Sequence, residues 1–302
     1  MEKIDSKVVN APIRWAGSKK KLLNEMLHAF ETDKDVYIEP FLGSGIVLLN
    51  VLENQMYRKY YVNDINSNLI LFYNTLKNDS AQLIKRIETL CHEYNSFPND
   101  EEKWDYFYKK RDSFNKKQIR CVTRSALFWF LMKAGYNGVY RVNSKGKFNV
   151  PCGKRDKIVC NKKKMEEISE KIQNVEFSCM DYNLFIDMIL EKEKKKSIFM
   201  YCDPPYMPET ESSQKHILYT QNGFEHEKFI EYMDKICDKF DISVMISMAE
   251  TKNVEQMYKE HSYFDKVKID EIVRKVNPTK KMKSKEVVFV NYKVDENSVI
   301  TP

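Results

Sequence analysis

The sequence predicts a doubly wound α/β fold, in which a mostly parallel sheet of seven strands carries helices on both faces and is interrupted by an inserted, mainly helical domain. Three observations predict it. Short apolar runs of strand length recur along the chain, the first of them alternate with helical periodicity, and residues 79–120 are charged and helical in pattern. Such alternation is typical of parallel sheets. With 302 residues, the chain has room for two domains.

The first elements follow the order β-α-β-α. A loop at residues 15–21 leads into a helix, for which Ser18 is the expected cap. Strands are expected at residues 36–38 and 60–62, and each is followed by apolar residues at helical spacing, at 46–52 and 69–76. This order opens a parallel sheet.

Residues 78–160 are the expected insertion between the two parts of the sheet domain, 1–77 and 161–302. Within the insertion, residues 125–134 form a strongly apolar helix that ends at a glycine-containing break at 135–138. Residues 139–150 then predict a β-hairpin with Ser144-Lys145-Gly146 at its turn.

The sheet pattern resumes after the insertion. Strands are expected at residues 175–179, 198–202 and 242–246, with helices at 182–190 and 225–240 between them. A closing antiparallel pair is expected from two further apolar segments, 264–273 and 286–292. These strands bring the predicted total to seven.

The charge is modest overall but unevenly distributed. The net charge is +6. Residues 141–164 contain nine Lys or Arg residues and a single acid, and residues 272–285 contain six Lys or Arg residues and no acid. Basic stretches of this kind bind phosphates by releasing counterions, so a polyanionic partner is one interpretation. The other is a solvated surface.

Composition excludes several classes of protein. The seven cysteines have no C-x-x-C spacing and the five histidines are scattered, which favours reduced thiols and predicts no metal site. No window of 18 apolar residues exists, so no membrane association is expected, and the N-terminus does not read as a signal peptide. We expect a cytoplasmic protein without an obligate protein partner, acting as a monomer.

The motif Asp203-Pro204-Pro205-Tyr206 directly follows the apolar run at 198–202. The prolines restrict the backbone at positions 203 to 205, so the segment is preshaped. A carboxylate and a main-chain carbonyl can accept both hydrogens of an amino group, and Tyr206 offers a face on which a base can stack. A rigid turn that leaves a buried strand is the alternative interpretation.

A glycine-containing turn lies where open parallel sheets bind nucleotides. Gly43 and Gly45 stand between a strand and a helix, and Asp64 ends the next strand, where it can accept hydrogen bonds from ribose hydroxyls. NAD and S-adenosylmethionine both fit this pattern, and so does a structural turn with an exposed Asp64. Glu39, before the turn, would repel a pyrophosphate and suits a sulfonium and an amino group, which favours S-adenosylmethionine.

Two further residues are candidates for the same ligand. Trp15 can lie against it, and Asp181, at the end of the strand predicted at 175–179, can accept from an adenine amino group. An N-cap for the helix that starts at Tyr182 is the alternative role of Asp181.

Taken in order, the segments 15–19, 39–45, 63–64 and 203–206 resemble the motifs of Dam-type (D12 class) DNA adenine N6-methyltransferases. The likeness extends to the segments 136–143 and 146–151, which resemble that family's target-recognition hairpin, and covers residues 10–293. The resemblance implies a class I methyltransferase, Rossmann-like fold, S-adenosylmethionine as cofactor and double-stranded DNA as partner. It also implies that the target adenine is flipped out of the duplex.

With the resemblance included, the candidate residues form three groups. Catalysis is assigned to Asp203, Pro204 and Tyr206. The cofactor-binding candidates are Trp15, Lys19, Glu39, Phe41, Gly43, Gly45, Asp64, Asp181 and Asp203. The DNA-binding candidates are Arg14, Asn137, Val139, Arg141, Asn143, Pro151, Lys154 and Arg155, among which the resemblance implies that Arg141 reads a guanine edge.

The resemblance implies GATC as the target sequence, and three departures from the family pattern bear on it. Val139 stands where leucine is usual, Lys154-Arg155 where many members have Arg-Tyr, and Ser247-Met248 where Ser-Asn is common. A different recognition sequence is therefore the first alternative. A DNA-binding protein that keeps S-adenosylmethionine but lacks activity is the second.

Other activities fit the residues less well. A cytosine-C5 methyltransferase needs a cysteine nucleophile, and Pro151-Cys152, the only Pro-Cys pair, lies in the basic hairpin region. A protein-glutamine methyltransferase would have Asn at position 203. A dehydrogenase lacks support from the turn sequence, and RNA stays open as a substrate.

Overall fold

The computed structural model of this protein describes residues 8–116, 118–207, 224–259, 264–277 and 280–294. The strands are β1 (Val36–Glu39), β2 (Lys59–Asn63), β3 (Val175–Ser178), β4 (Ile198–Cys202), β5 (Ile242–Ala249), β6 (Asp265–Asn277) and β7 (Lys280–Val290). The helices are α1 (Leu23–His28), α2 (Ile46–Glu53), α3 (Ser67–Asn78), α4 (Ser80–Ser96), α5 (Asp100–Phe114), α6 (Cys121–Ala134), the 3₁₀ turn η1 (Tyr136–Gly138), α7 (Lys162–Lys171), α8 (Tyr182–Lys192), α10 (His226–Lys239) and α11 (Lys252–Lys259).

The strands form one seven-stranded sheet in the order β3-β2-β1-β4-β5-β7-β6. The five strands from β3 to β5 are parallel, and β7 runs antiparallel between β5 and β6. This arrangement confirms the predicted seven-stranded, mostly parallel α/β fold. The chain winds outward in both directions from β1 and β4, so the crevice of a doubly wound sheet lies at their carboxyl ends.

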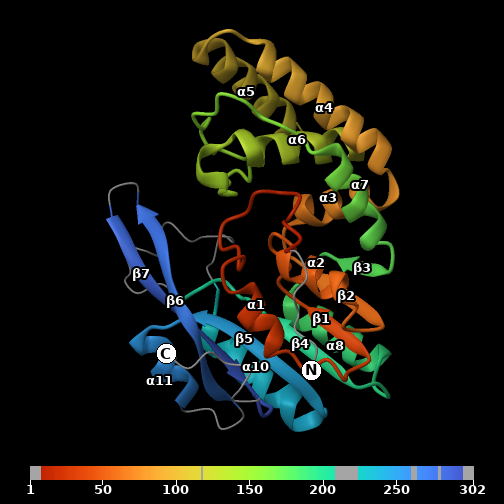
Figure 1. Ribbon diagram of the computed structural model, residues 1–302, viewed down its shortest axis with the longest axis vertical. Helices are drawn as coiled ribbons and strands as arrows, with labels where there is room; N and C mark the ends of the chain where they lie inside the picture. The colour runs from red at the N-terminus through yellow and green to blue at the C-terminus, as the bar shows by residue number, and fades with distance from the viewer. Residues whose placement is uncertain (1–7, 117, 208–223, 260–263, 278–279, 295–302) are drawn as a thin grey trace.

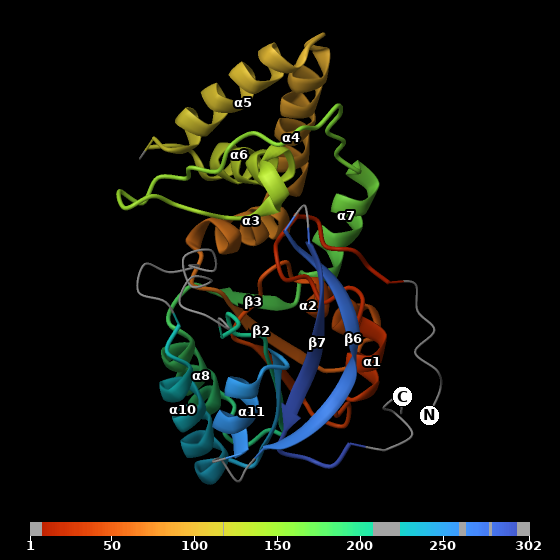
Figure 2. The ribbon, with the colours of Figure 1, turned by 90° about the vertical axis from the view of Figure 1, so that its left-hand side faces the viewer.

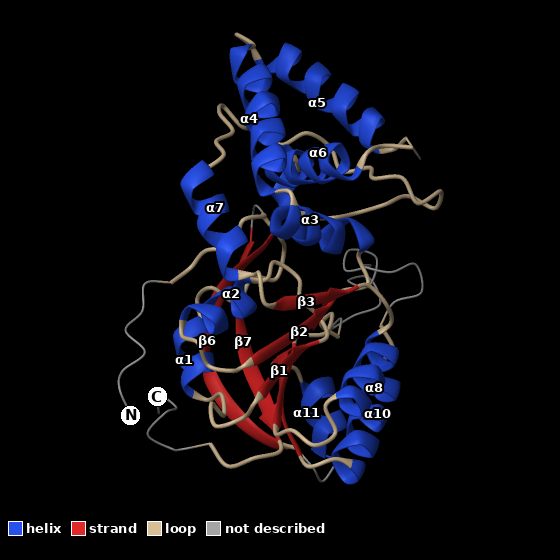
Figure 3. Cartoon of the chain, turned by 90° about the vertical axis from the view of Figure 1, so that its right-hand side faces the viewer, coloured by secondary structure: helices blue, strands red, loops and turns tan. Residues whose placement is uncertain are grey.

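Both faces of the sheet are buried, and the strand alternation divides its side chains between two cores. Tyr37 packs with α1, α2 and α3 on one face, whereas its neighbours Val36 and Ile38 pack with α8, α10 and α11 on the other. Figure 3 shows these two helical layers on either side of the sheet. Burial on both faces explains why the strands are nearly continuous apolar runs in the sequence.

Helices α4, α5 and α6 form a separate lobe above the sheet (Figure 1). Helix α6 packs against both α4 and α3, and α7 packs against α4 as the chain returns to β3. In α6, the residues from Ser125 to Met132 are all buried, which confirms the apolar helix expected at 125–134. Figure 2 shows this lobe resting on α3, with the long β6–β7 pair reaching up from the sheet toward it.

The predicted hairpin at 139–150 is a chain reversal with little regular ladder. One isolated bridge joins Val142 to Phe148, and the Asn143 amide donates to the Lys147 carbonyl at 2.9 Å. The turn contains Gly146 at φ 70°, as the Ser144-Lys145-Gly146 signal indicated.

Three local features differ from the sequence expectations. Ser18 does not cap α1, because the helix starts later and Leu22 stands at its N-cap without a side-chain hydrogen bond. Helices α7 and α11 were not expected, because each buries only two or three side chains among charged residues, such as Met165 and Ile168 in α7. Such a sparse apolar face is a weak periodic signal.

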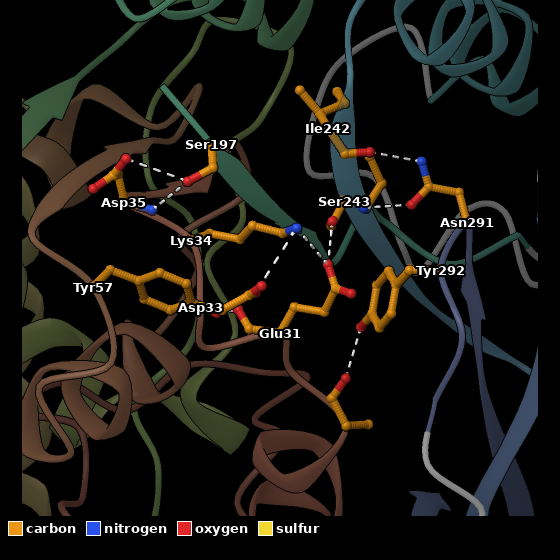
Figure 4. Close-up of polar contacts among 12 residues, drawn as sticks. Glu31, Asp33, Lys34, Asp35, Tyr57, Ser197, Ile242, Ser243, Asn291 and Tyr292 are labelled. Carbon is orange, nitrogen blue, oxygen red and sulfur yellow. Dashed lines mark hydrogen bonds and ion pairs between the residues drawn. The ribbon is translucent and has the colours of Figure 1, made fainter. Parts of the chain in front are cut away.

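Polar contacts fasten the amino ends of the parallel strands, opposite the crevice (Figure 4). The Ser197 hydroxyl accepts from the Asp35 amide at 3.0 Å, which joins the starts of β4 and β1. The Asn291 side chain accepts from the Val244 amide at 2.7 Å and donates to the Ile242 carbonyl at 2.8 Å, which fixes the chain after β7 to β5. These contacts therefore lie at the end of the sheet opposite the crevice.

None of the helices in the described ranges is long and apolar enough to cross a bilayer. Among the same residues, no group of three or more His, Cys, Asp or Glu side chains could hold a metal ion. The basic stretch 272–285 falls on β6 and β7, and its side chains lie outside the described part of the structure.

Candidate functional site

The carboxyl ends of β1, β2 and β4 open into one cavity of about 840 Å³. Parallel strands end at the same edge of a sheet, so residues that follow separate strands meet there. The sequence predicted eleven catalytic and cofactor-binding residues. Ten line it and Gly45 does not; the ten are Trp15, Lys19, Glu39, Phe41, Gly43, Asp64, Asp181, Asp203, Pro204 and Tyr206.

Asp203 and Lys19, both in the lining of this cavity, form an ion pair. The Lys19 Nζ lies 2.6 Å from each carboxylate oxygen of Asp203, and the lysine side chain is only 2% exposed. A carboxylate has about four acceptor positions on its two oxygens, so one ammonium group does not by itself occupy all of them. The resemblance implied Lys19 as a cofactor contact, and the geometry adds that it holds Asp203.

Tyr206 places its ring against the same lysine. The Lys19 Nζ lies 4.7 Å from the ring centroid, a cation–π distance. The Tyr206 hydroxyl donates to the buried carboxylate of Glu286 on β7. Pro204, between Asp203 and Tyr206 in the motif, is buried in the cavity wall. The Asp203 carboxylate and the Tyr206 ring are thus both held by contacts with other elements.

The turn after β1 is shaped by two glycines with different roles. Gly43 has φ 51° and lines the cavity, and its amide donates to Asp64 Oδ2 at 3.0 Å. Gly45 has φ 71° and points elsewhere: a Cβ there would lie 2.9 Å from the Cζ of Tyr73. Its missing side chain therefore leaves room for Tyr73 of α3.

Acidic residues outnumber basic ones in the lining of the cavity. Glu39 is 1% exposed and accepts from the Tyr37 hydroxyl at 2.9 Å. Burial holds the pKa of Glu39 well above its ordinary value, opposed by this hydrogen bond and reinforced by Asp203 and Asp64. Burial likewise raises the pKa of Asp64, although the amides of Asn66 and Gly43 oppose it. The cavity is thus arranged for a cationic ligand.

Trp15 and Asp181 both line the cavity. Trp15 stacks on Tyr140 of the hairpin, with ring centroids 6.0 Å apart, and so joins the cavity to the inserted segment. Asp181 is the N-cap residue of α8 but makes no side-chain capping hydrogen bond. Its exposed carboxylate remains available to the cavity, which favours the ligand interpretation over the capping one.

Sequence reasoning missed an aromatic wall of the cavity. Phe41 was predicted, but it packs against Tyr182 at 5.5 Å and Phe224 at 5.7 Å between ring centroids. Both partners line the cavity. Tyr182 directly follows Asp181, which was a usable signal, whereas nothing local connects Phe224 to the site. Glu286 was also missed, because it lies 80 residues after Tyr206 in the sequence.

The hairpin candidates lie outside the cavity. Arg141 is exposed, and its Nε donates to Asn149 Oδ1 at 2.9 Å, so the guanidinium is held by the opposite arm. Asn143 uses its side-chain oxygen to accept from the Lys145 and Lys147 amides, both at 3.0 Å. Its oxygen therefore supports the turn.

Arg14 connects the N-terminal loop to the break before the hairpin. A Cβ on Gly138 would lie 2.7 Å from the Arg14 Cδ, so only glycine fits beneath this side chain. The Arg14 Nη1 is buried and has no hydrogen-bond partner among the described residues. The remaining DNA candidates are half-buried Val139 and exposed Asn137, Pro151, Lys154 and Arg155.

Known proteins resemble this chain in sequence over most of its length. The family model of D12 class N6 adenine-specific DNA methyltransferase matches residues 15–276. Type II methyltransferase M.MjaIII of Methanocaldococcus jannaschii is 34% identical, over 78% of this chain and 82% of that protein. The DNA adenine methylase of Haemophilus influenzae is 31% identical, over 92% of each. A solved rRNA methyltransferase of Streptomyces viridochromogenes aligns with a TM-score of 0.36 at 10% identity, over 96% of this chain and 92% of that one.

The sequence match, the strand order and the cavity agree with one another. The chain therefore belongs to the D12 class N6 adenine-specific DNA methyltransferases, and its methyl donor is S-adenosylmethionine.

Proposed function

We propose that this protein methylates N6 of an adenine that is flipped out of duplex DNA, within the sequence GATC, and that Asp203, Pro204 and Tyr206 carry the chemistry. The observation that carries the proposal is the cavity at the carboxyl ends of β1 and β4, where the Asp203 carboxylate and the Tyr206 ring meet around Lys19. An exocyclic amine needs two acceptors and a stacking surface, and this motif supplies both.

The residues of the cavity fit S-adenosylmethionine. Glu39 and Asp64 are acids in a partly apolar cavity, where a sulfonium and an ammonium group would compensate their charge. The aromatic wall of Phe41, Tyr182 and Phe224 suits an adenine ring. When bound, the cofactor supplies an electrophilic methyl group.

Asp203 and Pro204 act on the target amine. Its nitrogen is a weak nucleophile, because its lone pair is delocalised into the adenine ring. Hydrogen bonds to the Asp203 carboxylate and the Pro204 carbonyl draw the nitrogen toward a tetrahedral geometry, and this frees the lone pair. Lys19 compensates the Asp203 charge at 2.6 Å without using all of its acceptor positions. Positioning and preorganised charge supply most of the rate.

The inserted segment 78–160 is proposed as the target-recognition domain, with 1–77 and 161–302 as the catalytic domain of a monomeric, cytoplasmic enzyme. Arg141, Asn137, Val139, Asn143, Pro151, Lys154 and Arg155 contact the DNA, and Arg14 joins them. Exposure of the Arg141 side chain and its support by Asn149 suit the bidentate reading of guanine.

The test is single-molecule methylation mapping of DNA from a methylation-free host that expresses the chain. Modified adenine at GATC is expected, and modification at another motif would overturn the target sequence alone. Asp203→Ala should give unmodified DNA, and its cooperative thermal unfolding should show that the variant is folded. Appreciable turnover by this variant would sink the assignment of Asp203. DNA that stays unmodified with the unaltered chain would favour a binding protein without activity.

A further inference from the structure

A buried carboxylate lies behind the ring of Tyr206. Glu286 is 2% exposed, and its Oε2 accepts a hydrogen bond from the Tyr206 hydroxyl. Glutamate is almost never fully buried unless its charge has a partner. Here it begins a segment of β7 in which Val287, Val288, Phe289 and Val290 are all buried and apolar. An acid at this place in a core strand calls for an explanation.

The position of Glu286 is fixed by the sheet. It pairs in register with Ala249 at the end of β5, and β7 lies between β5 and β6. The carboxylate is therefore held at the crevice edge by a strand with neighbours on both sides. A group on a paired strand is placed more rigidly than one on a loop.

Tyr206, by contrast, belongs to no helix or strand. Two prolines fix the backbone before it, but nothing in regular secondary structure sets the angle of its ring. Among the contacts that do so are the Lys19 Nζ, 4.7 Å from the ring centroid, and the hydrogen bond to Glu286. A stacking platform needs a fixed plane, because small misplacement of a reacting group lowers the rate strongly.

Glu286 does not itself line the cavity. Its buried carboxylate accepts from the Tyr206 hydroxyl, so we expect any effect on the reaction to pass through Tyr206. We propose that Glu286 is a positioning residue, which holds the Tyr206 ring in the plane on which the target adenine stacks. This inference rests on the proposed function of Tyr206.

The test compares Glu286→Leu, Glu286→Gln and Tyr206→Phe with the unaltered enzyme in steady-state methylation of duplex DNA. Loss of a hydrogen bond to a charged group should lower kcat about ten-fold in Glu286→Leu, and about equally in Tyr206→Phe. The KM for S-adenosylmethionine should stay unchanged. Glu286→Gln keeps an acceptor oxygen and should recover most of the lost kcat.

A double variant separates positioning from general damage to the fold. If Glu286 acts through the Tyr206 hydroxyl, Tyr206→Phe combined with Glu286→Leu should be no slower than either single variant. With 2-aminopurine at the target position, these variants should give brighter emission than the unaltered enzyme, because looser stacking quenches less. Tyr258→Phe is the matched control: its ring stacks on Phe289 of the same strand, and its hydroxyl has no partner among the described residues. This control should keep full activity.

Each outcome has a distinct meaning. Full kcat in Glu286→Leu, or losses that multiply in the double variant, would overturn the positioning role. Should Glu286→Leu fail to fold, Glu286→Gln and Tyr206→Phe still decide, because the proposal requires activity in the first and a loss in the second. Tyr206→Ala tests the proposed function separately. Activity in Tyr206→Ala would remove the role of Tyr206 itself, whereas an inactive Tyr206→Ala beside a fully active Glu286→Leu would remove only that of Glu286.

Discussion

At the scale of single residues, the cavity gathers acids that repel one another. Asp203 and Asp64 both raise the pKa of Glu39, after burial as the first cause, and Lys19 is the cation paired with Asp203. Like charges in a desolvated site oppose folding, and a bound cation relieves them. The acids proposed to bind the cofactor are therefore expected to destabilise the cofactor-free protein.

Glu39→Gln should separate these two effects. Glutamine can still accept from the Tyr37 hydroxyl, which now lies 2.9 Å from the carboxylate, but it carries no charge. We expect the cofactor-free variant to be more stable by about 1 kcal/mol, because a desolvated charge is removed. Its stabilisation by S-adenosylmethionine should shrink. Differential scanning fluorimetry with and without cofactor measures both, and a lower melting temperature without cofactor would contradict the argument.

At the scale of elements, the β1–α2 turn shows how a backbone conformation fixes a site. Gly45 is the N-cap residue of α2 with φ 71°, and the Tyr73 hydroxyl donates at 2.5 Å to the carbonyl of Ser44. The turn is thus clamped from α3, and the Gly43 amide is aimed at Asp64. Backbone geometry and tertiary packing act here on the same few atoms.

Gly45→Ala should destabilise the protein more than Gly146→Ala. Both glycines have positive φ, so alanine costs about 1 kcal/mol of strain at either place. A Cβ at Gly146 meets nothing within 4 Å, whereas at Gly45 it collides with the Tyr73 ring. We expect a total loss of about 3 kcal/mol for Gly45→Ala. Urea unfolding of the two variants compares them directly, and equal losses would rule out the clash.

At the scale of the whole molecule, stability should fall on mild acidification. Burial lowers the pKa of His226 to about 4, against an ordinary value of 6.5. Between these values the unfolded chain binds the proton and the folded chain does not, so stability is full above pH 6.5 and declines toward pH 4. The decline attributable to His226 is at most about 3 kcal/mol.

His226→Leu should flatten this part of the stability profile. Denaturant unfolding of the variant and of the unaltered protein at pH values from about 4.5 to 7 provides the measurement. A slope that survives His226→Leu would assign the acid sensitivity to other groups.

DNA binding should depend on salt through the exposed cations beside the hairpin. Each phosphate contact removed lowers the slope of log K against log salt by about 0.9, so Lys154→Gln with Arg155→Gln should lower it by about 2. Both side chains are exposed. Lys194→Gln, whose ammonium lies 2.7 Å from Glu191 at the far end of α8, should leave the slope unchanged. Fluorescence anisotropy at several salt concentrations gives the slopes.

How much of the site could be predicted from the sequence depends on how far apart in the sequence the interacting residues lie. Glu39, Asp64 and Asp203 each follow an apolar strand, so their meeting at one sheet edge could be predicted from local pattern and parallel topology alone. The Lys19–Asp203 pair spans 184 residues and the Tyr206–Glu286 pair 80. Nothing local encodes such pairs. The contact between Gly45 and Tyr73 was missed for a similar reason, because the two residues come together only through the packing of α3.

The place of β1 in the sheet has a consequence for biosynthesis. Val36 pairs with Lys59 on one side, but with Ile198 on the other. While a ribosome makes the intervening residues, β1 is an unprotected edge with apolar faces, open to pairing with other chains. Only after β4 has emerged can the nascent chain close its sheet and gather Glu39 beside Asp203. The nascent chain is therefore most prone to aggregation before S-adenosylmethionine can bind and stabilise it.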